Sequence, residues 1–210
     1  MKIIEVKTLS FPEIKVIRFA RFRDQRGYFT EVYKKSDFDT NPDLAFVKNM
    51  TFVQTNVSCS KKKTIRGLHF QWDPYMSKLV RVVDGEMIDL ILDIRKGSPT
   101  FGKMIGYDLS TNVDRDYNEW IWVPKGFAHG SLYLEDTIIE YFCDTEWSPK
   151  SEASISPLAS DIDWSLCEDK YKILFKQIVS QGPLISDKDK NGFTLEAWKN
   201  SLESENFVFI

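Results

Sequence analysis

The chain has 210 residues and a formal net charge of −3, with 42% hydrophobic and 28% charged residues. This composition is ordinary for a soluble globular protein, and the length allows one large domain with a substantial core. The weakly acidic balance offers no basic surface for nucleic acid, and no apolar run approaches the roughly 20 residues that span a bilayer. The charged, alternating start also lacks the apolar core of a signal peptide. We therefore expect a cytoplasmic protein without nucleic-acid or membrane partners.

The cysteine content points to a reducing compartment. Cys59, Cys143 and Cys167 are odd in number and far apart, with no CxxC pair. This spacing argues against a disulfide framework and against a zinc site built on paired cysteines. We expect all three to be small packing residues.

Residues up to about 147 read as a succession of short strands. Segments rich in Val, Ile, Phe, Tyr and Thr recur at a spacing of roughly 8–12 residues, which is typical of a sandwich or barrel. Asp84-Gly85 stands between two of them and predicts a tight hairpin turn. The predicted strands are 16–21, 27–33, 52–58, 65–71, 79–83, 86–94, 103–109, 120–123, 130–134 and 138–144.

Helical patterns occur only after residue 161. They cover 163–178 and 194–203, with Thr194 as a candidate N-cap and a polar loop at 180–192 between them. The sequence thus predicts an all-β fold, a cupin-like jelly-roll β-barrel formed by residues 1–160. A short C-terminal helical segment, residues 161–210, is expected to pack on this barrel.

Only two histidines exist, His69 and His129, and each lies in a strand-like segment beside a glycine. Histidine is the usual general base near neutral pH, although a partly buried structural imidazole explains either residue taken alone. A metal-binding barrel needs a close pair of histidines, and His69 is followed by Phe70, Gln71 and Trp72. We therefore expect no metal.

A histidine without a metal or a nucleophile suggests plain proton transfer beside a ketone. That chemistry also needs a cation for the enolate oxygen and an acid that returns a proton. Lys78, at the start of a strand, and Tyr141, in an apolar strand, are candidates; a solvated lysine and a core tyrosine are the alternatives. The segment 22–31 carries two arginines that suit a phosphate, whereas Lys61-Lys62-Lys63 is expected to form a solvated turn.

Six motifs together resemble the dTDP-4-dehydrorhamnose 3,5-epimerase family, in register from about residue 14 to residue 189. The motifs are FRDQRGYF at 22–29, FVQTNVS at 52–58, RGLHFQ at 66–71, KLVRV at 78–82, DIRKGSPTFG at 93–102 and PKGFAHG at 124–130. The resemblance implies a cupin-type homodimer that exchanges N-terminal strands and acts without a cofactor. Its members invert C3 and C5 of a nucleoside-diphosphate 4-keto-6-deoxy sugar in deoxysugar biosynthesis for polysaccharides or glycosides.

The resemblance also implies roles for individual residues. His69 would be the base, Asp189 its orienting partner, Lys78 the group that stabilises the enolate, and Tyr141 the acid. Arg66 would face the phosphate and His129 the sugar, while Arg26 would come from the partner subunit. The implied substrate-binding set is Arg26, Phe29, Glu31, Gln54, Asn56, Arg66, His129 and Trp147.

Strict alternation along the strand at 65–71 places Arg66 and His69 on opposite faces. Both can reach one cavity only if the strand is bulged or strongly twisted, which Gly67 would permit. The sequence therefore predicts an irregularity at Gly67.

Three positions depart from the family pattern. Ser131 replaces an aromatic residue, and Glu146-Trp147 replaces a tyrosine pair that stacks on thymine. A GDP- or CDP-linked 4-keto sugar therefore stays open as the substrate. The alternatives to 3,5-epimerisation are single-carbon epimerisation at C3, 3,4-ketoisomerisation, and a barrel that binds a sugar nucleotide without catalysis.

Overall fold

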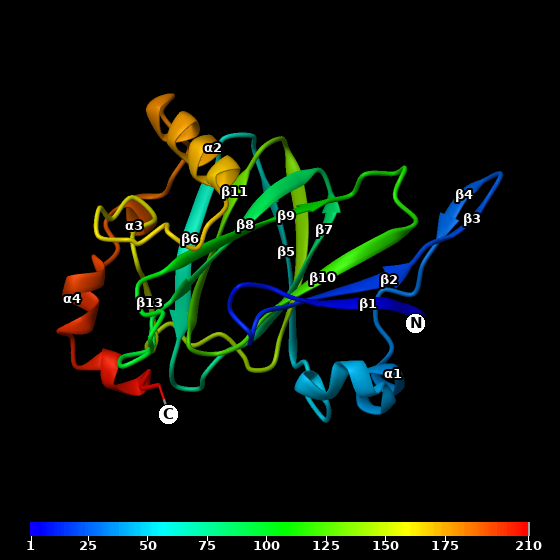
Figure 1. Cartoon of the computed structure of the whole chain (residues 1–210), viewed down its shortest axis with the longest axis horizontal. Helices are drawn as coiled ribbons and strands as arrows, with labels where there is room; N and C mark the ends of the chain where they lie inside the picture. Colours follow the sequence, from blue (N-terminus) through cyan, green and yellow to red (C-terminus); the bar gives the residue numbers. More distant parts are fainter. Residues whose placement is uncertain (210) are drawn as a thin grey trace.

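Two antiparallel sheets face each other in the computed structural model, which describes residues 1–209 (Figure 1). The larger sheet contains, in spatial order, β1 (Ile3–Thr8), β2 (Lys15–Ala20), β10 (Tyr117–Val123), β7 (Lys78–Asp84), β12 (Thr137–Cys143) and β5 (Gln54–Ser60). The smaller contains β13 (Glu152–Ser154), β6 (Ile65–Gln71), β11 (Phe127–Tyr133), β8 (Glu86–Asp93) and β9 (Met104–Ser110). The predicted all-β jelly roll is confirmed.

Most of the helices lie in the C-terminal segment, beside the smaller sheet (Figure 1). They are α2 (Asp169–Ser180), α3 (Asp187–Lys190), α4 (Leu195–Lys199) and the 3₁₀ turn η2 (Glu203–Asn206). Two further short helices, α1 (Lys35–Thr40) and the 3₁₀ segment η1 (Pro42–Val47), precede β5. Across residues 1–209, no helix has the length and apolar character needed to cross a membrane.

Strand β8 explains how the layers hold together. Ile88, Leu90 and Leu92 face outward and pack in one cluster with residues of α2 and α4, while Met87 and Ile91 face inward toward the larger sheet. A strand covered on both faces needs apolar residues at successive positions rather than in strict alternation. Asp89 interrupts this run as a fully buried carboxylate and therefore requires a partner.

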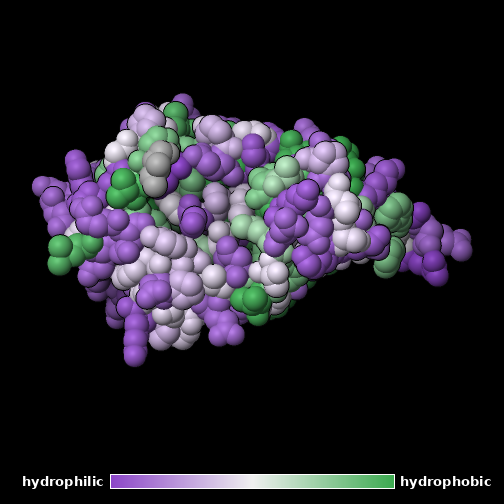
Figure 2. Space-filling view, turned by 90° about the horizontal axis from the view of Figure 1, so that it is seen from below, coloured by the Kyte–Doolittle hydropathy of each residue, from purple (hydrophilic) through white to green (hydrophobic). Residues whose placement is uncertain are grey.

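A two-stranded ribbon, β3 (Phe22–Asp24) and β4 (Gly27–Phe29), projects away from the sheets (Figure 1). Arg21 anchors its base, since its guanidinium donates to the backbone oxygens of Asn112 at 2.7 Å and Arg115 at 3.1 Å. Figure 2 shows one face of the molecule, mostly hydrophilic, with hydrophobic residues in small groups. The exposed side chain of Phe29 on this ribbon, 66% accessible, is therefore notable.

The predicted hairpin at Asp84-Gly85 is wrong. Strand β7 belongs to the larger sheet and β8 to the smaller, so the turn carries the chain from one sheet to the other. Gly85 has φ +94°, and a Cβ there would lie 2.6 Å from the backbone oxygen of Asp136. The glycine signals a sharp corner, but it does not specify which strands pair.

Several predicted boundaries need correction. The strand predicted at 27–33 ends at Phe29, the helix predicted at 163–178 begins at Asp169, and the loop predicted at 180–192 contains α3. The sequence analysis did not predict β1, α1 or η1. Helix α1 has only six residues, of which Phe38 alone is buried, so its sequence shows no helical period. Thr194 is confirmed as an N-cap, since its side chain accepts from the Ala197 amide.

The cysteines are free, but one of them does not pack. Cys143 and Cys167 are buried, as predicted, whereas Cys59 is exposed on the edge strand β5. The prediction that all three are packing residues is therefore wrong for Cys59, whose alternation along β5 places its side chain outward.

Candidate active site

Strand β6 carries an irregularity that turns two of its side chains toward one cavity. Its register with β11 pairs His129 with His69 and Ser131 with Arg66, so β6 uses one more residue than β11 over the same length. Gly67 lies within this bulge at φ +103°, and a Cβ there would lie 2.6 Å from Gly130 Cα. The predicted irregularity is present, and Arg66 and His69 line the same cavity.

His69 is hydrogen-bonded to a carboxylate from a distant part of the chain. Its Nε2 lies 2.7 Å from Asp189 Oδ1, and the Gly67 amide donates to Asp189 Oδ2 at 3.2 Å. Burial alone would raise the pKa of Asp189, but the hydrogen bond and charge of His69, with the Gly67 amide and Ser186, lower it. An ionised Asp189 accepts the Nε2 proton, which leaves Nδ1 as the basic nitrogen of the ring.

A second histidine–carboxylate pair lies deeper. His129 Nε2 is 2.8 Å from Oδ2 of the buried Asp89, on the neighbouring strand β8. The Asp89 side chain is fully inaccessible and that of His129 is 11% exposed. This pair is therefore less accessible than His69, whose side chain is 34% exposed.

Lys78 and Tyr141 face the same cavity from β7 and β12. Burial lowers the pKa of Lys78, against the opposing influence of the acidic groups around it, and its amine makes no hydrogen bond or ion pair within residues 1–209. Burial, with smaller contributions from Cys143 and Tyr133, raises the pKa of Tyr141. The cavity thus holds an unpaired amine and a protonated phenol near an oriented imidazole.

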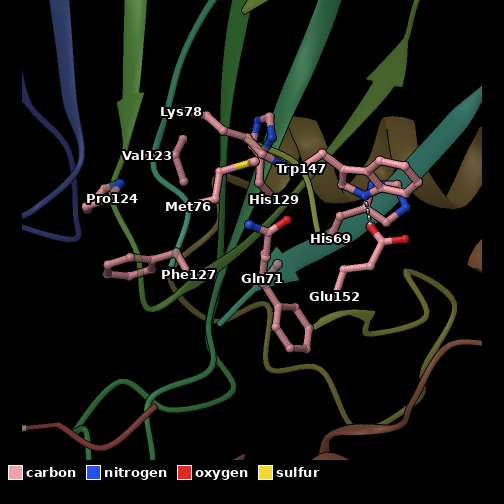
Figure 3. A pocket seen from close by; sticks show the side chains of 11 residues that line it. His69, Gln71, Met76, Lys78, Val123, Pro124, Phe127, His129, Trp147 and Glu152 are labelled. Carbon is pink, nitrogen blue, oxygen red and sulfur yellow. Dashed lines mark hydrogen bonds between the residues drawn. The ribbon is translucent and has the colours of Figure 1, made fainter. Parts of the chain in front are cut away.

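Trp147 stands at the cavity mouth in a fixed orientation (Figure 3). Its backbone amide donates to Gln54 at 2.8 Å, and its indole N–H donates to Glu152 Oε2 at 2.9 Å. The other Glu152 oxygen pairs with Lys188 of α3. Figure 3 shows Trp147 and Glu152 beside His69, with Lys78 and His129 further along the same pocket.

Two adjoining chambers of about 310 and 130 Å³ share His69, Lys78 and Tyr141. Five of the substrate-binding residues predicted from the resemblance also line one of them: Gln54, Asn56, Arg66, His129 and Trp147. Asp189 reaches this site through His69. Arg26, Phe29 and Glu31 line neither chamber; they lie on or beside the projecting ribbon, where Arg26 pairs with Asp24.

Sequence reasoning did not place several residues at the cavity or directly behind it. Ser131 and Tyr133 follow His129 by two and four positions on β11, so alternation along this strand could have identified them. Asp89, Glu152 and Lys188 carried no comparable signal, because each depends on a contact between distant segments. Within the described part of the chain, no group of three or more His, Cys, Asp or Glu side chains is arranged to hold a metal ion.

Comparisons with known proteins point to one enzyme family. The sequence profile described as dTDP-4-dehydrorhamnose 3,5-epimerase matches residues 8–197. The chain is 38% identical over 191 residues to the dTDP-4-dehydrorhamnose 3,5-epimerase of Shigella flexneri, covering 89% of this chain and 93% of that protein.

Two solved structures are informative. The dTDP-6-deoxy-D-glucose-3,5-epimerase of Legionella pneumophila, solved with dTDP-4-keto-L-rhamnose, superposes with a TM-score of 0.78 at 32% identity and covers 98% of both chains. A 3′-monoepimerase of Streptomyces bikiniensis, solved with dTDP-quinovose, has a TM-score of 0.73 at 27% identity and covers 90% of this chain and 87% of its own. The profile match and the identity to the Shigella flexneri relative establish that this chain belongs to the dTDP-4-dehydrorhamnose 3,5-epimerase family.

Proposed function

We propose that this chain inverts C3 and C5 of a dTDP-linked 4-keto-6-deoxy sugar, with His69 as the base. The observation that carries the proposal is the 2.7 Å contact between His69 and Asp189 beside the unpaired amine of Lys78. The ketone at C4 acidifies the C–H bonds at both neighbouring carbons. His69 Nδ1 takes one of these protons, and the electron pair of the broken C–H bond moves into an enolate.

Lys78 stabilises the enolate oxygen in this proposal. Its amine has no protein partner in residues 1–209, so the negative charge that develops on O4 would meet a donor that nothing else occupies. The lowered pKa reflects the cost of holding a cation out of water, and an anion formed beside it offsets that cost. The amine therefore interacts more strongly with the enolate than with the neutral ketone.

Tyr141 returns a proton to the opposite face of the sugar. Its raised pKa keeps the phenol protonated at neutral pH, so it can donate to the enolate carbon. Donation from the face opposite His69 inverts the carbon, whereas return from His69 would regenerate the starting sugar. The base and the acid then exchange their protons with water before the second carbon reacts.

The larger chamber is proposed to hold the nucleotide. Trp147 offers a flat surface for base stacking, and Gln54 and Asn56 offer amide donors beside it. The Legionella pneumophila relative was solved with a dTDP-linked sugar, which supports the same nucleotide here. Arg66, on the rim of the smaller chamber, is proposed to bind the diphosphate.

We further propose a homodimer with exchanged N-terminal strands, in which the ribbon serves the partner's site. Arg26, Phe29 and Glu31 are too far along the projecting ribbon to line their own cavity, and Phe29 is exposed. An exposed aromatic residue beside an arginine is typical of an interface. Residues 1–160 would form the barrel, and residues 161–210 would complete it by contributing Asp189.

One alternative is carried by a specific observation. The Streptomyces bikiniensis 3′-monoepimerase shares this fold, so the fold is compatible with inversion at one carbon only. A GDP- or CDP-linked sugar, a 3,4-ketoisomerase and a non-catalytic barrel are the remaining alternatives, and one experiment separates them.

That experiment is proton NMR of dTDP-4-keto-6-deoxyglucose incubated with the protein in D₂O. Deuterium at both C3 and C5 is the expected result. Deuterium at C3 alone, with the ketone still at C4, would make the protein a single-carbon epimerase, and deuterium at C4 with the ketone moved to C3 would make it a 3,4-ketoisomerase. His69→Asn is the control for exchange that the site does not catalyse. If exchange is absent with the dTDP, GDP and CDP sugars, the protein is a binding barrel and the proposal is wrong.

A further inference from the structure

Trp147 is held at the mouth of the larger chamber by contacts to two other segments. The residue is 56% exposed, yet its backbone amide donates to Gln54 and its indole N–H donates to Glu152 (Figure 3). Glu152 lies on β13, and β13 pairs with β6, the strand that carries His69. An exposed ring that is fixed in this way loses little conformational freedom when a ligand stacks on it.

The carboxylate that accepts from the indole also contacts the helical turn that carries Asp189. Glu152 accepts from Trp147 with one oxygen and pairs with Lys188 of α3 through the other. Burial alone would raise the pKa of Glu152, but the hydrogen bonds of Lys188 and Trp147 lower it below its ordinary value, so the carboxylate is ionised at neutral pH. One carboxylate therefore connects the proposed stacking surface to the turn that places Asp189 beside His69.

Helix α3 is a single turn with few polar attachments to the barrel. Of its four residues only Asp189 is buried, and the chain on either side is bonded to other segments through the backbone at residues 184 and 193. Within residues 1–209, the turn itself is attached through Asp189, through Lys188, and through the backbone oxygen of Lys190, which accepts from Ser156 at 2.9 Å. A turn with so few attachments is expected to open more readily than the sheets.

The strength of the ion pair between Lys188 and Glu152 depends on the access of water. The Lys188 side chain is 58% exposed and the Glu152 side chain 18%. Water screens exposed ion pairs, so they stabilise a fold very little, and the same pair is stronger where solvent is excluded. Trp147, Glu152 and Lys188 all line the larger chamber. A nucleotide bound there would displace water from the pair and strengthen both contacts of Glu152.

We propose that Glu152 is a positioning residue that couples binding of the nucleotide to the order of α3. The inference rests on the proposed function, because it takes the nucleotide to bind in the larger chamber against Trp147. A base stacked on the indole strengthens the contacts of Glu152 with Trp147 and Lys188, and α3 then opens less often. Asp189 stays beside His69 while the substrate is bound, so the imidazole keeps the orientation that proton abstraction requires.

The test measures hydrogen exchange of the α3 backbone amides in the full chain, by mass spectrometry, with and without dTDP. We expect saturating dTDP to slow exchange in the peptide 185–192 by about tenfold, a size typical of coupling between two sites. Glu152→Gln keeps an oxygen that can accept from the indole but loses the charge that pairs with Lys188. In this variant dTDP should still bind but should slow exchange much less. Equal slowing in both proteins, or no slowing in the native chain, would overturn the proposal.

Variants of the exposed Lys188, which should fold normally, test the ion pair from its other side. Lys188→Arg retains a cation for Glu152 and should keep the protection by dTDP, whereas Lys188→Met should lose it. If Lys188 instead contacts dTDP directly, protection survives in Glu152→Gln, which contradicts the proposal. Lys61→Met is the matched control, because it removes an exposed ion pair with Asp136 and Lys61 lines neither chamber. Loss of protection in Lys61→Met would also contradict the role of Glu152.

The outcome is separable from that of the proposed function. Deuterium exchange into the 4-keto sugar without protection of α3 by dTDP would leave the epimerase intact and remove the coupling. Protection of α3 without exchange into the sugar would support the coupling and describe a barrel that binds the nucleotide without catalysis. If dTDP does not bind the native chain, both the proposed nucleotide and the coupling are wrong.

Discussion

The candidate active-site cavity is lined by two histidines, each hydrogen-bonded to an aspartate behind it, with nearly equal distances and different surroundings. His69 and Asp189 lie 2.7 Å apart at the accessible end, and His129 and Asp89 lie 2.8 Å apart at the buried end. His129 and His69 are also direct neighbours across β11 and β6. Hydrogen-bond geometry therefore does not distinguish the proposed base from its neighbour, whereas access to the cavity does.

The origin of the two carboxylates differs as well. Asp89 belongs to the strand next to His129, so the sheet itself holds this pair in place. Asp189 comes from α3, a single helical turn whose N-cap, Ser186, accepts from the Asp189 amide. The accessible pair thus depends on a contact between distant segments, whereas the buried pair lies within one sheet.

The largest expected effect comes from removing the accessible imidazole. His69→Asn should reduce the rate of deuterium exchange at both carbons by roughly 10²–10⁴-fold, the contribution of one general base. The assignment of the accessible histidine as the base would be wrong if His129→Asn, measured in the same way, caused the greater loss of exchange while binding of dTDP was retained. Normal exchange by His69→Asn would exclude His69 as the base.

A smaller loss, which depends on the readout, is expected from Tyr141→Phe. Abstraction by His69 survives in this variant, but the opposite face receives no proton, so net inversion should fall by roughly 10²-fold while exchange falls less. NMR integration of exchanged substrate against inverted product measures both processes in one sample. If exchange and inversion fall equally, Tyr141 supports the cavity without acting as the acid, and His129 becomes the better candidate.

Asp189→Asn should weaken catalysis less than loss of the base itself and should also change the response of stability to acid. Because the native pKa of Asp189 lies below its ordinary value of 3.8, its contribution to stability is present above that value. The contribution disappears as the pH falls through the native pKa. Urea unfolding at neutral and acidic pH should therefore show a smaller loss of stability on acidification in the variant, and an equal loss would contradict the paired carboxylate.

The smallest effect is a gain in stability on removing the buried amine. Burial lowers the native pKa of Lys78 from 10.5, so the charged amine is less stable in the folded chain than in the unfolded chain and opposes folding at neutral pH. Lys78→Met should raise the free energy of unfolding at neutral pH by about 0.5–2 kcal/mol while abolishing exchange. The gain should shrink as the pH approaches 10.5, and a destabilised variant would show that the amine has a partner in solution.

Strand β6 could be predicted from the sequence itself, whereas Asp189 and Lys78 could not. Strand β6 was predicted with its observed bounds, Ile65–Gln71, because its β-branched and aromatic residues lie between clear turn signals. The conflict between Arg66 and His69 correctly indicated a bulge, since alternation is a local property of the backbone. Asp189 and Lys78 came from the family resemblance, because no local pattern relates residues on different segments.

The features that the sequence did not predict depend on contacts between residues far apart in the chain. The corner at Gly85 resembles a hairpin because both arrangements require a glycine with positive φ, and the choice depends on which sheet each strand joins. Asp89 sits in an apolar run that gives no indication of its partner forty positions away. Glu152 contacts both Trp147 and Lys188 in a position that depends on the pairing of β13 with β6.

The contact between Gly67 and Gly130 limits how this protein can be evolved in the laboratory. A Cβ at position 67 would lie 2.6 Å from Gly130 Cα, and a Cβ at position 130 would lie 2.4 Å from the Arg66 backbone oxygen. Because backbone atoms cause both clashes, no compensating side-chain change relieves either one. Libraries that vary the residues lining the two chambers should therefore hold both glycines constant.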